Sequence, residues 1–506
     1  MTVRTRSSIL GVAIVAVAAL AACSDDNNGI APIPPGAAEI TLDIETSRTL
    51  YAETTYTLKG FIHVKSGATL TVMPGTTIQG ALSPAGSSLF ILPGGKIQAV
   101  GTATKPIVFT SSNPAGSRQP GDWGGLIIVG KAIDNRSAGS PSGVEVEGTN
   151  TCGAGCTTSG QNYQVIYSGG SDNADDSGEL RYVRVEFAGF APSNGNELNS
   201  FTFAAVGNKT KLSYLQAMAG LDDSYEWFGG AVDADHLVSY EAGDDHFDMS
   251  ESYSGRIQYA IAFQSTVLTP RSGAGTVASD PEGIENDGCN GSGCTNGFNT
   301  TPYTIPMVAN YTIVGTGSKA SSGSSTTDGG IGMMIRRGTG GYYVNGIVAR
   351  YPLAGASVRS SEAYARAGST ATPDPATTDL AIRNVLFVEV PSVFQAPVGT
   401  AEASVQNSFD LTANALVNNT TATAASLFTK FPATVTSTTT AADFDWTPAA
   451  SSPALSGGLA TFTGKLATKA ATATPTGNTI AGTSFVGAAS ASTGKWWDGW
   501  TVYFRN

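Results

Sequence analysis

The alternation of apolar and polar positions between Lys211 and Gln264 repeats at one fixed offset. The aligned segments are Tyr214-Leu215, His236-Leu237 and Gln258-Tyr259, together with Gly220 to Glu226 and Ala242 to Asp248. A unit of this length has too few residues to bury an apolar face alone, and its β-branched and aromatic content favours strands. The pattern therefore predicts the stacked, strand-bearing coils of a solenoid.

Two similar segments precede this repeat. One apolar run leads into Met73-Pro74-Gly75, and another leads into Leu92-Pro93-Gly94. Each is followed by a further apolar residue at the same place, so both read as strand, turn, strand, and we interpret them as further coils. Short strands are also predicted at 105–110 and 124–129, and the second is apolar enough to be covered on both faces.

The strands expected downstream each begin with asparagine. They are 310–314, 345–348 and 384–388. A side-chain amide at such a turn can bond to the coil above it, as in the asparagine ladders of parallel β-helices, so these asparagines are interpreted as structural. Two polar stretches, 131–179 and 269–306, are predicted to be long excursions from the coil, and a short insertion is expected between Tyr182 and Tyr214.

These turns and strands, with the segment from Gly121 to Leu126, resemble right-handed parallel β-helix proteins of the pectate-lyase-like superfamily. The resemblance spans 40–395 and is strongest to surface lipoproteins of Gram-negative bacteria. It implies an all-β fold, a right-handed parallel β-helix with long loop excursions and a C-terminal capping region. Activity does not follow from it, since this fold hosts lyases, hydrolases, adhesins and structural proteins.

The N-terminus has the features of a targeting segment. Arg4 and Arg6 precede an apolar stretch, 9–20, that is short for a membrane span. The following Leu20-Ala21-Ala22-Cys23 resembles a lipoprotein cleavage motif. This resemblance implies a signal peptide over 1–22, a lipidated Cys23, a tether over 23–38 and a location at the outer membrane or cell surface, with membrane contact only through the lipid. An ordinary secretory signal is the alternative.

The rest of the chain is expected to form a β-helix domain over 39–400 and an Ala/Thr-rich region over 401–506 that caps it. Trp496, Trp497 and Trp500 lie close together near its end. We interpret these tryptophans as a cover for the open end of the solenoid, which would otherwise expose apolar side chains. A platform on which sugar rings stack is the alternative.

Composition narrows the possible partners. Charged residues make up 13% of the chain, glycine occurs 61 times, and the net charge is −12. This balance is typical of an extracellular, turn-rich β protein and disfavours nucleic acid or an anionic membrane surface as a partner. Neither a Gly-x-Ser-x-Gly motif nor a His-Glu-x-x-His motif occurs, so hydrolysis by a serine triad or zinc is not predicted.

Four cysteines remain after Cys23, in two close pairs. They are Cys152 with Cys156, and Cys289 with Cys294. In an exported protein the simplest interpretation is two local disulfides that pin loop tips, and a four-cysteine zinc site is the alternative.

The repeat also stacks acidic residues on one another. Coils about 4.8 Å apart would place Asp222 over Asp244, Asp223 over Asp245 and Glu226 over Asp248. Like charges at that distance repel by about 1 kcal/mol in water, and more when desolvated. Compensation could come from Ca²⁺ bound by Asp222, Asp223, Asp244, Asp245 and Asp248, from Arg256 or Arg336-Arg337, or from water. Asp280, Glu282, Glu285 and Asp287 are expected in a solvated loop, with a metal site as the alternative.

Two functions follow from these observations. The preferred one is a lipid-anchored, non-enzymatic surface protein that binds a glycan or another surface protein, with Ca²⁺ as its candidate cofactor. The alternative, implied by the superfamily resemblance, is a calcium-dependent polysaccharide lyase that acts on acidic glycans, with Arg256 or Arg336 as the base.

Overall fold

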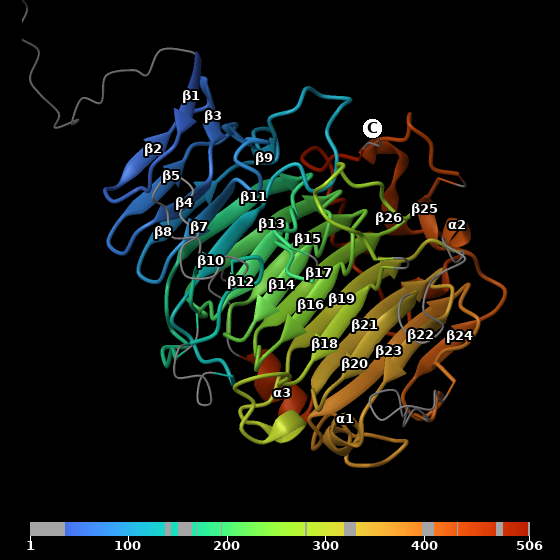
Figure 1. The fold of residues 1–506 in the computed structure, drawn as a ribbon. Helices are drawn as coiled ribbons and strands as arrows, with labels where there is room; N and C mark the ends of the chain where they lie inside the picture. The colour runs from blue at the N-terminus through green and yellow to red at the C-terminus, as the bar shows by residue number, and fades with distance from the viewer. Residues whose placement is uncertain are drawn as a thin grey trace, which may run out of the picture.

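Two parallel β-sheets run the length of the molecule, and the chain winds between them as a right-handed parallel β-helix (Figure 1). The computed structural model describes residues 36–136, 143–149, 164–167, 169–193, 195–278, 281–317, 330–396, 409–432, 434–471 and 479–503. The fold class expected from the sequence is confirmed.

The first sheet contains β1 (Gly36–Ile40), β2 (Arg48–Leu50), β3 (Thr54–Leu58), β5 (Thr69–Val72), β6 (Thr77–Gly80), β8 (Lys96–Val100), β9 (Ile107–Ser111), β11 (Gly178–Glu186), β13 (Lys211–Met218), β15 (Ala234–Tyr240), β17 (Arg256–Phe263), β19 (Met307–Val314), β21 (Gly341–Ala349), β23 (Leu380–Val388) and β24 (Leu416–Asn419). The second sheet contains β4 (Phe61–Val64), β7 (Ser88–Ile91), β10 (Leu126–Val129), β12 (Phe201–Ala204), β14 (Tyr225–Phe228), β16 (Phe247–Ser250), β18 (Ile284–Asp287), β20 (Ile331–Arg336) and β22 (Ala354–Val358). The remaining elements are the antiparallel pair β25 (Phe428–Lys430) and β26 (Asp445–Pro448), the helices α1 (Ser361–Arg366), α2 (Ala424–Leu427) and α3 (Gly464–Ala471), and the 3₁₀ turns η2 (Gly297–Asn299), η3 (Ala441–Asp443) and η4 (Pro453–Leu455).

Near the N-terminus each coil has short, separate strands in the first sheet, and two of these strands merge further along. β8 pairs with the first half of β11 and β9 with its second half. The two halves meet at Tyr182, whose φ is 49°. This left-handed residue bends the strand at a corner of the coil, so one long strand takes the place of two.

The repeat seen in the sequence is confirmed in its first half and shifts by one residue in its second. Leu215 pairs with Leu237, as the repeat predicts, whereas Leu237 pairs with Ala260 rather than Tyr259. The extra residue lies in the turn between β16 and β17, where Glu251 and Ser252 both have positive φ. The prediction that Leu237 stacks on Tyr259 is therefore wrong, and His236 packs on Tyr259 instead, with ring centroids 5.0 Å apart.

The similarity between the two Pro-Gly segments does not mark stacked coils. The strand before Pro74 is β5 in the first sheet, and the strand before Pro93 is β7 in the second. True neighbours in this region are further apart along the chain, as in the pairing of Tyr56 with Ile78 and of Thr69 with Lys96. The Pro-Gly turn occurs at two corners of the same coil, so the two similar segments do not stack on each other.

The asparagines of the downstream strands lie in one column with the bending residue Tyr182. The column is Tyr182, Tyr214, His236, Tyr259, Asn310, Asn345 and Asn384, all with φ between 49° and 63°. The asparagines are structural, as expected, but within the described part of the chain no hydrogen bond joins one of them to the next, so the predicted ladder is wrong. Asn345 instead accepts a hydrogen bond from Leu459 N at 2.6 Å, and Asn384 donates to Gly457 O at 2.7 Å.

These bonds hold a C-terminal strap, residues 457–471 and 479–503, along the side of the coil. The strap runs back toward the N-terminal coils, where Trp500 meets Tyr182 and Tyr214 edge-on at 5.6 and 6.2 Å. Trp496, Trp497 and Trp500 are 9%, 2% and 1% exposed. Both predictions for them are therefore wrong: they cover the side of the coil rather than its open end, and their buried rings offer no platform to a sugar.

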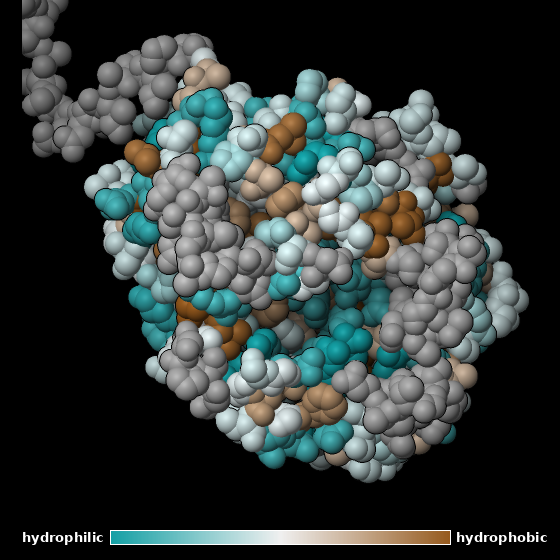
Figure 2. Space-filling view, viewed as in Figure 1, coloured by the Kyte–Doolittle hydropathy of each residue, from teal (hydrophilic) through white to brown (hydrophobic). Residues whose placement is uncertain are grey.

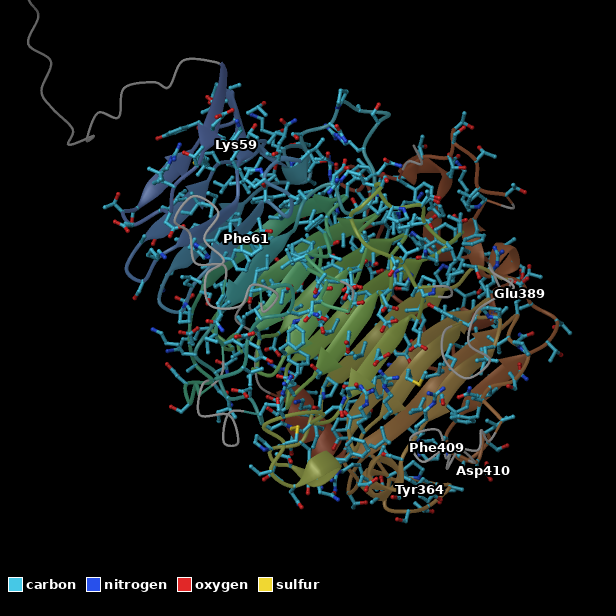
Figure 3. The ribbon with its side chains drawn as sticks, viewed as in Figure 1. Lys59, Phe61, Tyr364, Glu389, Phe409 and Asp410 are labelled. Atoms are coloured by element: carbon cyan, nitrogen blue, oxygen red, sulfur yellow. A yellow bond between two sulfur atoms is a disulfide. The ribbon has the colours of Figure 1, made fainter. Side chains whose placement is uncertain are left out.

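The interior of the coil is filled from end to end by one apolar cluster. At the far end from β1, Tyr364 stacks on Phe409 of this cluster, at 6.5 Å (Figure 3). Phe61 packs against Phe90 at 4.9 Å in a separate cluster on the other face of the second sheet. The stretch 269–306, expected to be one excursion, returns to the second sheet as β18. Within the described ranges, no helix has the length and apolarity that a membrane span requires.

Candidate functional site

Acidic side chains line the outer face of the second sheet. Side chains alternate along a strand, so Tyr225 and Trp227 of β14 point into the core while Glu226 points out. Glu226 is in register with Asp248 of β16, and Asp248 with Glu285 of β18. The predicted stacking of Glu226 on Asp248 is confirmed, and Glu285, expected in a loop, extends the row.

The turns that lead into these strands carry the two Asp-Asp pairs. The backbone N–H of Asp245 donates to Asp223 Oδ1 at 2.7 Å, and that of Glu282 donates to Asp245 Oδ1 at 3.1 Å. The predicted stacking of Asp223 on Asp245 is thus confirmed as a side-chain to backbone link. Each carboxylate clamps the next coil, so the pairs have a structural role whether or not they bind a ligand.

In each of three places, carboxylate oxygens lie close enough together to bind one ion. The groups are Asp222 with Asp223 and Asp244; Asp223 with Glu226 and Asp248; and Asp245 with Glu282 and Glu285. Within each group the nearest oxygens lie within 4.8 Å of one another. Ca²⁺ binds oxygen at about 2.3–2.6 Å, so oxygens this close can all reach one central ion. The five predicted ligands are divided among the three groups, with Asp222, Asp223 and Asp244 in the first, Asp248 in the second and Asp245 in the third, and carboxylate oxygens are donors that suit calcium.

Burial and mutual repulsion disfavour the charged forms of these acids. Burial raises the pKa of Asp223 well above its ordinary value, and the charges of Asp222, Asp248 and Asp244 raise it further. Burial raises the pKa of Asp244 to about 6, although nearby Arg336 opposes the rise. The pKa of Glu147 is raised to about 7, again chiefly by burial.

A cavity of about 550 Å³ opens over this face, and we call it the acidic cleft. Figure 2 shows hydrophilic residues in a hollow at the middle of the molecule, over the strands β14 to β20 of Figure 1. Its described lining includes Glu145, Glu147, Tyr167, Asn196, Glu226, Phe228, Asp248, Ser250, Glu251, Glu285, Asp287, Asn290, Ser292 and the three arginines Arg136, Arg336 and Arg337.

The two arginines considered as catalytic bases are both held in ion pairs. Arg256 belongs to the first sheet, where Asp233 Oδ2 lies 2.6 Å from its Nη2, and the fold does not bring it to the cleft. Arg336 lines the cleft, but it pairs with Glu285 and Asp287. Burial alone would lower the pKa of Arg336, but the adjacent carboxylates raise it. An arginine so placed keeps its proton and is poorly suited to act as a base.

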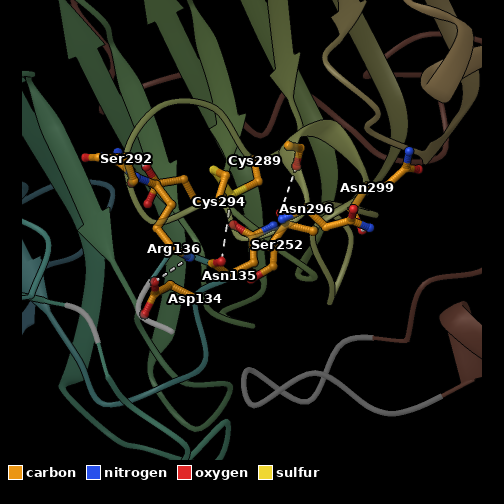
Figure 4. The surroundings of a disulfide bond; sticks show 12 residues. Asp134, Asn135, Arg136, Ser252, Cys289, Ser292, Cys294, Asn296 and Asn299 are labelled. Carbon is orange, nitrogen blue, oxygen red and sulfur yellow. Dashed lines mark hydrogen bonds and ion pairs between the residues drawn. A yellow bond between two sulfur atoms is a disulfide. The ribbon is translucent and has the colours of Figure 1, made fainter. Parts of the chain in front are cut away.

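One wall of the acidic cleft is a loop closed by the predicted disulfide between Cys289 and Cys294, which is confirmed with its Cα atoms 5.7 Å apart (Figure 4). Arg136 Nε donates to Ser292 O of this loop at 3.1 Å, and Arg136 also pairs with Glu251. The loop thereby holds a guanidinium at the edge of the cleft. Cys23, Cys152, Cys156 and Asp280 lie outside the described residues.

The acids that escaped the sequence prediction are Glu145, Glu147 and Glu251, which line the cleft, and Glu197, whose charge raises the pKa of Asp244. Glu147 shares a hydrogen bond with Glu226, and Glu251 accepts one from the hydroxyl of Tyr167. Glu147 lies in the excursion after β10, and Glu197 lies in the insertion after β11. No repeat offset points to them, because they reach the cleft by tertiary folding. Glu251 sits in the turn whose extra residue shifted the repeat.

Comparison with known families matches residues 42–437 to the model described as "Pectate-lyase like beta helix domain". Comparison with curated proteins and with solved structures finds no match.

Proposed function

The chain belongs to the pectate-lyase-like β-helix family, and on that premise we propose that it is a lipid-anchored surface protein whose acidic cleft region binds Ca²⁺ and serves binding rather than catalysis. The observation that carries the proposal is the approach of carboxylate oxygens to within 4.8 Å in three adjoining groups. Stacked acids of this kind cost folding free energy unless a cation or a proton compensates them.

We place the cation first at Asp222, Asp223 and Asp244, at the edge of the cleft. Asp222 and Asp244 are partly exposed, so an ion can reach them and keep part of its water shell. Asp245, with Glu282 and Glu285, forms the next group along the coils. Asp248 belongs to the second group and also lines the cavity. When bound, Ca²⁺ would supply the positive charge that the stacked turns lack.

The ion pairing of the two candidate bases favours binding over catalysis. The lyase alternative needs a proton acceptor beside the metal, and both arginines considered for that role are paired with carboxylates. An outer-membrane or surface location rests on the resemblance of Leu20 to Cys23 to a lipoprotein cleavage motif. A surface protein of this kind would present its acidic cleft to the medium, where free calcium is plentiful enough for weak sites.

The test is a calcium titration of the full chain followed by calorimetry and by thermal melting. At a hundredfold excess over the dissociation constant, binding should stabilise the fold by about 2.7 kcal/mol. The double variant Asp222→Asn/Asp244→Asn should lose this gain. Asp379→Asn, which removes only a surface ion pair with Lys465, should keep it. Identical melting of the wild type in calcium and in excess chelator would contradict the proposal.

Catalysis is tested separately, with acidic polysaccharides and ultraviolet detection of unsaturated products. No calcium-dependent product is expected. Product formation that Asp244→Ala abolishes would replace the binding function with a lyase.

A further inference from the structure

The charges that line the acidic cleft do not balance. Three guanidinium groups face seven carboxylates, and each guanidinium is already paired: Arg136 with Glu251, Arg336 with Glu285 and Asp287, and Arg337 with Asp287. Among the described residues, the four acids left without an ion-pair partner are Glu145, Glu147, Glu226 and Asp248. A polyanionic ligand would therefore meet uncompensated negative charge and no available cation.

The three acids at the centre of the cleft, Glu147, Glu226 and Asp248, have few hydrogen-bond donors of their own, and Glu226 accepts one hydrogen bond, from Asn199 Nδ2. The side chains of Glu147 and Glu226 lie against each other, so two acidic groups meet at this point of the cleft. Asp248 Oδ1 is a buried atom with no hydrogen-bond partner among the described residues. Asp248 also lines the cavity, so its carboxylate group has room for a donor from outside the chain.

A protonated amine matches this arrangement. An ammonium group has three N–H donors and one positive charge, so it can bond to Glu226 and Asp248 together. These two side chains are in register on adjacent strands. Ser250, the next outward residue on β16, also lines the cleft and offers a hydroxyl oxygen as a further acceptor.

The other lining residues favour a sugar over a flexible polyamine. Phe228 lines the cleft beside Tyr167, with their ring centroids 5.8 Å apart, and gives an apolar surface against which a ring can lie. Asn196, Asn290 and Ser292 supply neutral donors and acceptors suited to hydroxyl groups. The volume of about 550 Å³ lies in the ordinary range for a small-ligand site.

We propose that the acidic cleft binds a cationic glycan, one whose hexosamine units carry free amines, with an ammonium group seated between Glu226 and Asp248 and its ring against Phe228. This inference rests on the proposed function in that it takes the cleft as the binding site. It is separate from the first calcium site, because Asp222, Asp223 and Asp244 are not part of the described cavity lining, whereas Glu226 and Asp248 also belong to the second carboxylate group.

The test compares three tetrasaccharides by calorimetry with the full chain: a glucosamine tetramer, its fully N-acetylated form and a galacturonate tetramer. The glucosamine tetramer should bind about ten- to a hundredfold more tightly than the acetylated one, the range expected for a charge-assisted hydrogen bond. Raising the salt concentration should weaken it. Equal or tighter binding of the acetylated or the galacturonate tetramer would overturn the proposal.

Variants locate the site. Asp248→Asn and Glu226→Gln should each remove most of the preference for the amine, whereas Asp379→Asn should not change it. Melting curves show whether each variant folds, and both replacements keep the size of the side chain and so create no cavity. A tetralysine peptide that binds as tightly as the glucosamine tetramer would overturn the glycan and assign the cleft to a cationic peptide.

Calcium titration of the same samples keeps the two proposals apart. Asp222→Asn/Asp244→Asn should lose calcium binding and keep the amine preference. If amine preference is present and calcium binding absent, the calcium proposal alone fails; if calcium binds and the amine preference is absent, the glycan proposal alone fails.

Discussion

Glu226 and Asp248 face each other on β14 and β16, and Glu226 also shares a hydrogen bond with Glu147. Three acids that meet in this way cannot all be charged without a cation, because each buried negative charge raises the pKa of its neighbours. The fold thus stacks residues that repel each other at the place where its cavity opens. Such an arrangement destabilises the protein when no ligand is bound, and it is typical of a site adapted to a ligand.

Without calcium, the stability of the protein should fall as the pH rises. The pKa of Asp244 is raised to about 6 and those of Glu147 and Glu285 to about 7, chiefly by burial. The folded protein therefore holds protons that the unfolded chain releases, and each pKa unit is worth about 1.4 kcal/mol. This contribution is complete below about pH 4, the ordinary range of these groups, and is lost as the pH rises through 6 to 7.

Melting temperatures in excess chelator at pH 5, 6, 7 and 8 check this expectation. The wild type should melt at progressively lower temperature, and Glu147→Gln should flatten the decline because an amide does not titrate. Calcium should also flatten it, since a bound cation favours the charged carboxylates. A melting temperature that rises from pH 5 to pH 8 in chelator would show that these groups are not protonated in the fold.

The coil architecture and the centre of the site could be predicted from the sequence because both depend on a local period. The offset that carries Tyr214 onto His236 also carries Glu226 onto Asp248, and the structure has this acidic pair in register. The same offset fails at Tyr259, where one extra residue in the preceding turn leaves the apolar pattern almost unchanged. A turn can gain a residue without altering the strands that it joins, so a fixed offset does not detect the added residue.

Features set by long-range packing could not be predicted. Glu147 enters the cleft from an excursion, and nothing in its sequence surroundings marks it. The repeat predicts that Asn345 bonds to the coil above, because that is the only partner a repeat offers. Asn345 bonds instead to Leu459 and Thr483, more than a hundred residues away along the chain. The prediction for Trp500 fails for the same reason, since the pattern of the strands gives no sign that the side of the coil needs a cover.

Replacement of Asn345 should loosen the C-terminal strap. Asn345 has φ of 59°, and its side chain bonds to Leu459 and to the hydroxyl of Thr483. Asn345→Ala loses these bonds and places a methyl group in a left-handed conformation, at a cost of about 2–4 kcal/mol. Asn345→Gly loses the same bonds without the strain and should be milder by about 1 kcal/mol.

Limited proteolysis followed by mass spectrometry measures the release of the strap directly. Cleavage after Lys465 or Lys469 should be faster in Asn345→Ala than in the wild type, with Asn345→Gly between them. Asn299→Ala removes a hydrogen bond from Arg366 and none to the strap, so it serves as the control and should be cut at the wild-type rate. Equal cleavage of all four proteins would mean that Asn345 does not hold the strap.

Removal of the Trp500 ring should destabilise the whole coil and not only its last residues. The side chain is 1% exposed, its Nε1 donates to Trp496 O at 2.7 Å, and its ring contacts Tyr182 and Tyr214 of two successive coils. Loss of a buried aromatic ring costs about 3–5 kcal/mol, so Trp500→Ala should lower the free energy of unfolding in urea by that amount. Leu455→Ala, at a side chain that is 45% exposed, should change it by less than about 0.5 kcal/mol. If Trp500→Ala lowers the free energy of unfolding by no more than this control does, the Trp500 ring is not buried in the protein. The interpretation of the tryptophans as a platform for sugars would then apply again.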